Sequence, residues 1–500
     1  MKILEDMKSV NLSSIIQAYK SLDEAQFSKM MGYYGIDTKK GIRDYELNCI
    51  EAFIDELIND IDNISIVDNY YIGFTIPQIG KEFDLLRFGK DNIINVELKI
   101  DSTIEKIHQQ QVRNFYYLNF LGKKINIFTF VYSERKLYKL VVDSNNSETI
   151  EVTINELFNE LLSQNVETYH DIDELFNPSD YLVSPFNSTE KFINGNYFLT
   201  VQQENIFHDI EKLIKYSTTN FIALTGDAGT GKTLLTYHIA KYYMSAGKRV
   251  LVLHCAQLNK GHYILKNDYE WKIHMPKYAP SFDDYDIIII DEAQRMYPSQ
   301  FKNFIQSINL LNKKCIFSYD AKQYLSKHEK NYEITNKIEA ELQCTPFTLT
   351  DKIRTNKEIS YFIKQLLNKN KNISGMEYPN IDFVYFKDYS MAKSYLDMRF
   401  KQGWKVPNYT PGIHSTFDYQ KYTSIDDDCA HSIIGQEYMK VVVVLDYSFK
   451  YKDSGELVAN NAYYSQKQML YQIITRAIKK LNIVIIKNTN MLERCIEILS

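Results

Sequence analysis

The chain has 500 residues, enough for about three domains and too many for a lone binding module. Hydrophobic residues make up 45% and charged residues 24%, which is typical of a globular protein and excludes a disordered or fibrous chain. With 58 Lys and Arg against 63 Asp and Glu, the net charge of -5 provides no overall field that attracts nucleic acid. Any polyanion must therefore be held locally.

The six cysteines are scattered and form no Cys-x-x-Cys pair, which argues against a zinc site or a disulfide framework and fits a reducing compartment. The first twenty residues lack the apolar core of a signal peptide, and no stretch reaches the roughly 18 apolar residues of a membrane span. We expect a cytoplasmic protein without a membrane partner.

The first part of the chain has an α+β pattern. Residues 41–60 place apolar side chains at helical spacing and predict an amphipathic helix. Segments 70–76, 82–88 and 94–100 are rich in β-branched and aromatic residues and predict strands. The sequence Gly-Lys-Asp-Asn at 89–92 is typical of a hairpin turn between the last two.

A polar run over residues 160–198, with two prolines, predicts a linker and a domain boundary near residue 185. After it, continuous apolar segments such as FIALTG, VLVLHC, DIIIID and VVVVLD alternate with helical stretches, as a parallel sheet covered on both faces requires. The predicted α/β domains are 1–185 with its linker, followed by two doubly wound parallel-sheet domains at 186–345 and 346–500.

A phosphate-binding pattern, GxxxxGK(S/T), lies between an apolar strand and a helix. Its glycines allow backbone N–H groups to surround phosphates at a helix N-terminus. Lys232 is expected to neutralise the β- and γ-phosphate oxygens of ATP, and Thr233 to supply a hydroxyl ligand to Mg²⁺. The candidate nucleotide-binding residues of this loop are Gly226, Ala228, Gly229, Thr230, Gly231, Lys232 and Thr233.

A second apolar strand, at 287–290, ends in two acids. In this setting Asp291 is predicted to bind Mg²⁺, and Glu292 to take a proton from the attacking water as a general base. An acidic strand end alone is more often a solvated edge, but together with the phosphate-binding loop it predicts ATP hydrolysis.

With these two motifs, the chain resembles superfamily 1 helicases over about 300 residues. Further segments follow in the order typical of that family: LTVQQ at 199–203, YDAKQ at 319–323 with Tyr in place of the usual Gly, IRTN at 353–356, HSIIGQE at 431–437 and IITRA at 473–477. The resemblance implies two RecA-like domains that bind ATP between them.

The same resemblance implies roles for individual residues. Gln203 would contact adenine and Gln323 would sense the γ-phosphate. Arg354 and Arg476 would be arginine fingers that reach the nucleotide from the second domain. Two residues implied to lie near the γ-phosphate and sugar are Gly435 and Glu437.

The short spacing between motifs leaves no room for the large insertions of processive unwinding enzymes, so we expect a compact motor. Unwinding, translocation alone and a conformational timer all stay open. The chain resembles minimal helicase-like ATPases fused to nuclease or Schlafen-type modules.

Two acids and a lysine fall on the predicted N-terminal strands. Glu97 and Lys99 are two apart and project from one face, and the hairpin partner supplies Asp84. With an αβββαβ element order, the region resembles PD-(D/E)XK nucleases. The resemblance implies that Asp84 and Glu97 bind Mg²⁺ and that Lys99 orients or deprotonates the attacking water. The alternative is a charged sheet face without catalytic function.

Other residues fit this interpretation less specifically. Gln111, followed by Phe115 where a Tyr is usual, resembles the extra Gln motif of helicase-fused nucleases. Glu46 or Glu51 would add a metal contact, or would lie on a solvated helix face. Lysines expected around the nuclease mouth are Lys106, Lys123 and Lys124.

The first functional hypothesis is an ATP- and Mg²⁺-dependent nuclease and helicase-like translocase acting on DNA, with anti-phage defence implied by resemblance. A second is a sensor or assembly ATPase whose N-terminal domain binds nucleic acid without cutting it. A third keeps the nuclease and assigns it RNA. A homo-oligomer or a partner protein of a defence system is compatible with each hypothesis.

Overall fold

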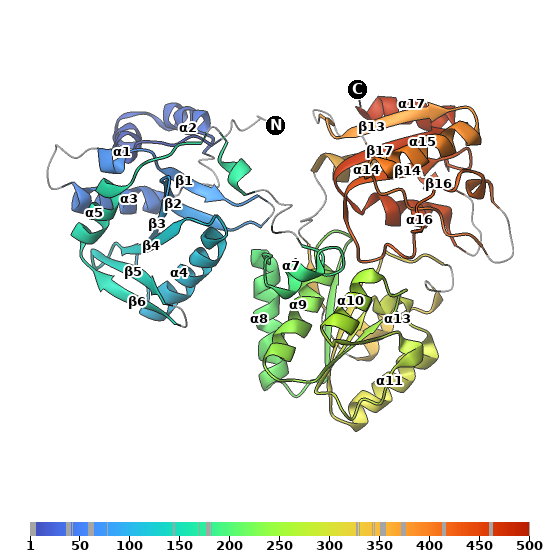
Figure 1. Ribbon diagram of the computed structural model, residues 1–500. Helices are drawn as coiled ribbons and strands as arrows, with labels where there is room; N and C mark the ends of the chain where they lie inside the picture. Colours follow the sequence, from blue (N-terminus) through green and yellow to red (C-terminus); the bar gives the residue numbers. More distant parts are fainter. Residues whose placement is uncertain are drawn as a thin grey trace. The chain divides into compact units, whose positions relative to one another are not determined.

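The computed structural model describes residues 7–36, 42, 44–58, 65–77, 79–143, 146–169, 171–176, 181, 183–326, 329, 331–342, 344, 346–350, 357–371, 377–412, 417–459 and 464–499. The chain divides into two compact units, Met1–Asp180 and Tyr181–Ser500 (Figure 1).

The first unit is built on one six-stranded sheet in the order β1-β2-β3-β4-β5-β6. Neighbouring strands are antiparallel except β3 and β4, whose parallel pairing requires the crossover helix α4. The strands are β1 (Tyr71–Thr75), β2 (Glu82–Phe88), β3 (Asn92–Lys99), β4 (Lys124–Val131), β5 (Lys136–Val142) and β6 (Ser147–Val152). The helices are α1 (Leu12–Ser21), α2 (Glu24–Tyr33), α3 (Asp44–Leu57), α4 (Ile104–Asn119), α5 (Ile154–Ser163) and the 3₁₀ turn η2 (Ile172–Leu175).

Different helices cover the two faces of this sheet. Val96 and Leu98 belong to one core with α1, α3 and α5, whereas Ile107 of α4 packs with Val131 and Tyr138 on the other face. Since side chains alternate along a strand, Glu97 faces α4. Ile100 lies just beyond the end of β3 and is 50% exposed.

The predicted N-terminal elements are present in the expected αβββαβ order. The helix predicted at 41–60 is α3, and the hairpin turn lies between antiparallel β2 and β3. The element order α3-β1-β2-β3-α4-β4 follows directly along the chain.

The second unit contains two parallel sheets, in the orders β12-β7-β11-β10-β8-β9 and β13-β17-β14, and a short ribbon of β15 and β16. The strands are β7 (Phe221–Gly226), β8 (Val250–His254), β9 (Lys272–His274), β10 (Ile287–Asp291), β11 (Lys314–Tyr319), β12 (Phe347–Leu349), β13 (Ile381–Phe386), β14 (Tyr438–Leu445), β15 (Lys450–Tyr451), β16 (Leu457–Val458) and β17 (Ala477–Ile486).

Helices and short turns flank these strands. They are α7 (Thr189–Ile193), α8 (Val201–Tyr216), α9 (Lys232–Ser245), α10 (Lys260–Asp268), η3 (Pro276–Tyr278), η4 (Ala293–Arg295), α11 (Pro298–Leu310), α13 (Ile334–Asn336), η5 (Lys337–Glu341), α14 (Lys357–Leu367), α15 (Tyr389–Lys401), η6 (Asp418–Tyr422), α16 (Gln466–Ile474) and α17 (Thr489–Leu499).

The first of these sheets is buried on both faces. Ile287 and Ile289 of β10 belong to one core, and Ile288 and Ile290 belong to another on the opposite face. This arrangement explains the continuous apolar runs in the sequence. The prediction of α/β architecture with parallel sheets is confirmed. We call the part built on the first sheet the first lobe and the part built on the second sheet the second lobe.

The predicted linker is wrong over its last part. Phe186, Phe192, Tyr197 and Leu199 are buried in the core of the first lobe, and the compact unit to which they belong begins at Tyr181. Their aromatic and apolar side chains anchor a segment whose overall composition is polar. At the other end of the lobe, β12 completes the first sheet just beyond the predicted boundary at residue 345.

Within the described part of the chain, no helix combines the length and the apolar character needed to cross a membrane. All six cysteines are free thiols.

Candidate active sites

The phosphate-binding loop connects β7 to α9. Gly229 and Gly231 have φ values of 79° and 81°, a left-handed conformation that favours glycine. Lys232 begins α9, and its Nζ donates to the carbonyl oxygens of Gly226 at 2.6 Å and Asp227 at 2.9 Å. The loop thus places an ammonium group and a helix N-terminus together, which is the arrangement that binds phosphate.

The two predicted acids lie at the carboxyl end of β10. Asp291 is 3% exposed, and its Oδ2 lies 3.0 Å from Nδ1 of His254 on the adjacent parallel strand β8. Glu292 follows in a left-handed conformation with φ 55°, which turns its side chain away from the strand direction. Its Oε2 accepts hydrogen bonds from Nε2 of Gln294 at 2.7 Å and Nε of Arg295 at 3.1 Å.

The surroundings of Glu292 keep it charged. Burial raises the pKa of this carboxyl, but the Arg295 guanidinium, His254 and Lys232 together lower it more, so its net pKa lies below the ordinary value. Glu292 is therefore ionised near neutral pH and able to accept a proton.

The segment after β11 adds two polar groups to the same edge. Asp320 is 2% exposed, and its Oδ2 lies 3.4 Å from Nζ of Lys232. Gln323 is 5% exposed, and its Nε2 has no hydrogen-bond partner among the described residues. A buried amide without a partner is costly unless a ligand satisfies it, which agrees with the predicted γ-phosphate contact.

Gln203 is buried beside the phosphate-binding loop. Its Oε1 accepts from the backbone N–H of Thr200 at 2.9 Å, and its Nε2 donates to the carbonyl of Gly231 at 3.2 Å. The side chain thus caps α8 and ties this helix to the loop. Contact with adenine stays a prediction.

Arg476 belongs to the second lobe and lies near two acids of the first lobe, Glu292 and Asp320. This guanidinium is 7% exposed; its Nε donates to the carbonyl of Gln472 at 3.1 Å. Burial lowers the pKa of Arg476, while Glu437, Glu292 and Asp320 oppose this shift through their charges. Since two of those acids belong to the first lobe, Arg476 lies within the field of the nucleotide site.

Gly435 of the second lobe also approaches the phosphate-binding loop of the first lobe. Its φ is 76°, and a Cβ added there would lie 3.8 Å from Cγ2 of Thr233. Glu437, also predicted near the nucleotide, is 8% exposed. Arg354, the other predicted arginine finger, lies outside the described residues.

Sequence reasoning did not single out three residues of this site. His254 contacts Asp291, Asp320 contacts Lys232, and Arg295 contacts Glu292. One signal was available: the apolar runs of β8, β10 and β11 each end in a polar residue, and parallel strands present these ends at one edge.

The N-terminal acids and lysine meet where β2 and β3 separate. The paired register reaches Leu85 and Val96; beyond it, Oδ2 of Asp84 accepts the backbone N–H of Leu98 at 2.8 Å. The backbone N–H of Asp84 lies 3.4 Å from Oε1 of Glu97, which is 1% exposed. The Asp84 side chain thus accepts a hydrogen bond from β3 where the backbone pairing between β2 and β3 has ended.

Asp84 lies within electrostatic range of both Glu97 and Lys99. Burial and the Glu97 carboxylate raise the pKa of Asp84 to about 8, although Lys99 and the Leu98 N–H act in the lowering direction. Glu46 raises it further and lines a small pocket with Asp84. Glu51, the other acid considered for this role, instead pairs with Lys20.

The donor chemistry at this site fits Mg²⁺, which prefers carboxylate oxygens. A raised carboxyl pKa reflects unfavourable negative charge that a divalent cation would relieve. The described residues contain no group of three or more His, Cys, Asp or Glu arranged to hold a metal ion. Binding of Mg²⁺ by Asp84 and Glu97 stays a prediction.

Gln110, rather than its predicted neighbour Gln111, reaches the acids. Nε2 of Gln110 donates to Oε2 of Glu97. Gln111 is fully buried; its Nε2 donates to Thr129 Oγ1 at 3.1 Å and its Oε1 accepts from Thr149 at 2.8 Å. Gln110 and not Gln111 therefore contacts Glu97, because adjacent positions on a helix point about 100° apart.

Lysines around the site also differ from those expected. Lys123 donates to Glu167 and Tyr169, and Lys124 is paired in register with Asn92, at the opposite end of β3 from Lys99. These two lysines are therefore not at the mouth. Lys106 is exposed at the start of α4.

Lys81 was missed. It is 8% exposed, and its Nζ donates to the carbonyl of Glu82 at 2.7 Å. Burial lowers the pKa of Lys81, and the charges of Glu97 and Asp84 only partly offset this shift. It places a second ammonium group beside the acids.

A phosphate-binding loop after β7, acids at the end of β10 in the same parallel sheet, and a buried arginine from a second lobe define a helicase-like P-loop ATPase. Residues 219–439 match the family model described as Schlafen group 3, DNA/RNA helicase domain. The match spans somewhat less than half of the chain and includes Lys232, Asp291 and Gly435 but not Arg476.

Solved structures give weaker likenesses. A Pif1 helicase from Candida albicans is 13% identical, covering 57% of this chain and 95% of its own with a TM-score of 0.34. A structure described as two coordinating Pif1 helicases at forked double-stranded DNA is 11% identical, covering 58% and 92% with a TM-score of 0.32. AMPPCP-bound DnaA from Aquifex aeolicus is 15% identical, covering 37% and 57% with a TM-score of 0.23. No curated protein matches this chain.

Proposed function

We propose that this protein is an ATP-dependent nuclease and helicase-like translocase that acts on DNA and restricts invading DNA in anti-phage defence. The main support is the position of Arg476, which belongs to the second lobe but lies in the electrostatic field of Glu292 and Asp320 in the first. Charged groups from two lobes at one nucleotide site are what a motor that opens and closes with hydrolysis requires.

In the ATPase, Lys232 and the backbone N–H groups of its loop bind the phosphates. Thr233 and Asp291 would hold Mg²⁺, which when bound neutralises phosphate charge. Glu292, ionised and fixed by Arg295, accepts the proton of the attacking water. Arg476 stabilises charge that develops on the transferred phosphate.

In the N-terminal unit, Asp84 and Glu97 would hold Mg²⁺ next to a phosphodiester. Lys99 orients the attacking water or helps remove its proton. Gln110 fixes the Glu97 carboxylate through its amide hydrogen bond. This cluster supports cleavage rather than a bare charged face because a buried acid pair is costly unless it has a function or a counterion.

The family description for residues 219–439 supports a nucleic-acid partner and names both DNA and RNA. ATP hydrolysis by the purified protein, measured with single-stranded DNA, duplex DNA and RNA, distinguishes the two because a translocase is stimulated by its track. We expect stimulation by DNA. Stimulation by RNA alone would replace DNA with RNA, and equal rates with and without any nucleic acid would contradict the translocase.

A further inference from the structure

Residues 183–188, which we call the clasp, lie close to the start of the second unit, which begins at Tyr181. Phe186 in the clasp is buried in the first lobe, with its ring centroid 4.0 Å from that of His262 and 4.9 Å from that of Tyr237. The clasp is thus an integral part of the ATPase and not a loose connection.

The backbone of the clasp lies directly against α10. A Cβ added to Gly261 would lie 2.3 Å from Cα of Phe186 and 2.4 Å from its carbonyl oxygen. Since real Cβ atoms do not approach backbone this closely, only glycine at 261 permits the observed contact.

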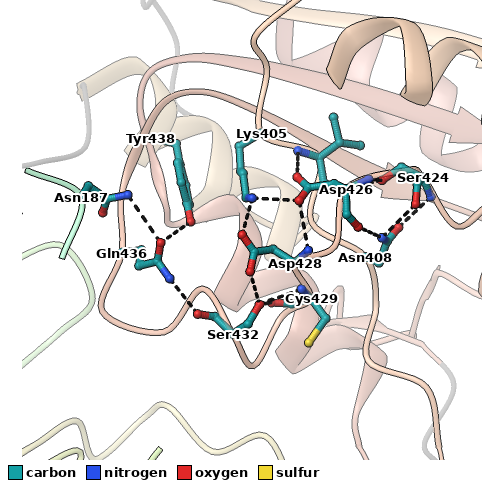
Figure 2. Close-up of polar contacts among 11 residues, drawn as sticks. Asn187, Lys405, Asn408, Ser424, Asp426, Asp428, Cys429, Ser432, Gln436 and Tyr438 are labelled. Carbon is teal, nitrogen blue, oxygen red and sulfur yellow. Dashed lines mark hydrogen bonds and ion pairs between the residues drawn. The ribbon is translucent and has the colours of Figure 1, made fainter. Parts of the chain in front are cut away.

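The same segment contacts the second lobe at residues 435–437, and Figure 2 shows the contact between Asn187 and Gln436. A Cβ on Gly435 would lie 2.7 Å from the Phe186 ring. Oδ1 of Asn187 accepts the backbone N–H of Glu437 at 2.9 Å, and its Nδ2 donates to Oε1 of Gln436 at 3.5 Å. Ser184 Oγ donates to the Gly435 carbonyl at 3.5 Å.

Polar contacts within the second lobe hold this loop from its other side. Figure 2 shows Gln436 between Asn187, Ser432 and Tyr438: its Nε2 donates to the Ser432 carbonyl at 2.8 Å, and Tyr438 Oη donates to its Oε1 at 2.6 Å. Ser432 in turn donates to Asp428 at 2.7 Å. Lys405 forms ion pairs with Asp428 and Asp426.

The loop that the clasp touches also supports Arg476. Nη1 of Arg476 donates to the Gln436 carbonyl at 3.4 Å, and the backbone N–H of Tyr438 donates to the Arg476 carbonyl at 2.9 Å. Two hydrogen-bonded steps therefore lead from Asn187 through Gln436 to the predicted arginine finger.

We propose that the clasp positions Arg476 for ATP hydrolysis by holding residues 435–438 against the first lobe. The inference rests on the proposed ATPase function and adds Phe186 and Asn187 to it as positioning residues. The residues that position Arg476 would then belong to the segment that follows the N-terminal unit in the sequence.

The proposal predicts an effect on kcat rather than on KM, because Arg476 acts on charge that develops in the transition state. Phe186→Ala removes the buried ring and is expected to lower kcat by about tenfold. Asn187→Ala removes two hydrogen bonds from a more exposed side chain and is expected to lower kcat by about threefold. Replacement of exposed Asn267 on α10 by Ala is the matched control and leaves kcat unchanged.

A second experiment displaces the clasp by the substitution Gly261→Ala in α10. The new methyl group improves helix propensity in α10 but pushes Phe186 away. Its matched control is Gly32→Ala in α2, where an added Cβ meets no atom within 4 Å. We expect a lower kcat only for Gly261→Ala, and equal kcat values for both variants would contradict the proposal.

A double-mutant cycle separates positioning from general damage. If the clasp acts through Arg476, Phe186→Ala has no further effect on kcat in an Arg476→Ala background. Multiplicative losses, or full activity of both clasp variants beside an active wild type, would overturn the proposal and leave the ATPase assignment intact.

Hydrogen exchange of residues 435–438 gives a readout that does not need hydrolysis. The proposal predicts faster exchange in Asn187→Ala than in Asn267→Ala. An inactive wild type would refute the ATPase, whereas unchanged exchange would refute the clasp, so the two failures are distinguishable.

Discussion

The ammonium of Lys232 lies 3.4 Å from Oδ2 of Asp320, which joins the phosphate-binding loop to the end of β11. Asp320 is buried, and its Oδ1 accepts the backbone N–H of Lys322 at 2.9 Å. Lys232 therefore supplies the countercharge for a buried acid, in addition to its proposed role in phosphate binding.

Replacement of Lys232 by Ala is expected to reduce ATP hydrolysis at least about a hundredfold, because a charge that stabilises the transferred phosphate is lost. The variant should also unfold more easily, by roughly 1–3 kcal/mol, because Asp320 loses its countercharge. Steady-state ATPase rates and thermal melting test both effects. Lys212→Ala, at an exposed position on α8, is the control; loss of activity there as well would point to a nonspecific cause.

In the N-terminal unit, Lys99→Ala is expected to abolish cleavage of nucleic acid and leave ATP hydrolysis intact. The proposed role of this lysine is to orient or deprotonate the attacking water, and it belongs to the first compact unit, whereas the ATPase residues belong to the second. Lys136→Ala, at the start of β5, should cut normally. Persistent cleavage by Lys99→Ala would discard the nuclease assignment.

The two neighbouring glutamines of α4 should behave differently. Gln110→Ala frees the Glu97 carboxylate and is expected to lower cleavage about tenfold with little change in melting temperature. Gln111→Ala removes the amide that donates to the buried Thr129 hydroxyl and to the Tyr138 carbonyl, and should destabilise the unit by about 1–3 kcal/mol. If Gln111→Ala alone impaired cleavage at full stability, the assignment of the two roles would be reversed.

Acid should destabilise the second unit through His238. Burial, with smaller contributions from Lys241 and His208, lowers the pKa of this imidazole to about 4, and its Nδ1 lies 2.6 Å from Tyr197 Oη. An unfolded His binds a proton below its ordinary pKa of about 6.5. The stabilisation is thus complete above pH 6.5 and is lost as the pH falls toward 4.

A His238→Gln variant tests this dependence, because Gln does not titrate. Its melting temperature should fall by roughly 2 °C less than that of the wild type between pH 7 and pH 4.5. Parallel pH profiles for both proteins would exclude His238 as the source.

The ATPase half was largely predictable from sequence because its signals are local. Glycines and a lysine at fixed spacing specify the phosphate-binding loop, and isoleucine runs such as that before Asp291 specify buried parallel strands. The contacts of His254 and Asp320 were not predictable, since they depend on which strands become neighbours in the sheet.

Two predictions from sequence were wrong for physical reasons: the choice of Gln111 and the assignment of Phe186 to a linker. A choice between Gln110 and Gln111 depends on helix rotation, which a one-residue error in phase reverses. The burial of Phe186 depends on Gly261 and Gly435, which are distant in sequence from it. The polar composition around Phe186 gave no sign of this packing.

The most direct test of the central claim is incubation of the purified full-length protein with end-labelled DNA and RNA, with and without Mg²⁺ and ATP. The account predicts shortened DNA products that require Mg²⁺ and disappear with Lys99→Ala. Intact DNA under every condition, beside an active ATPase, would contradict it.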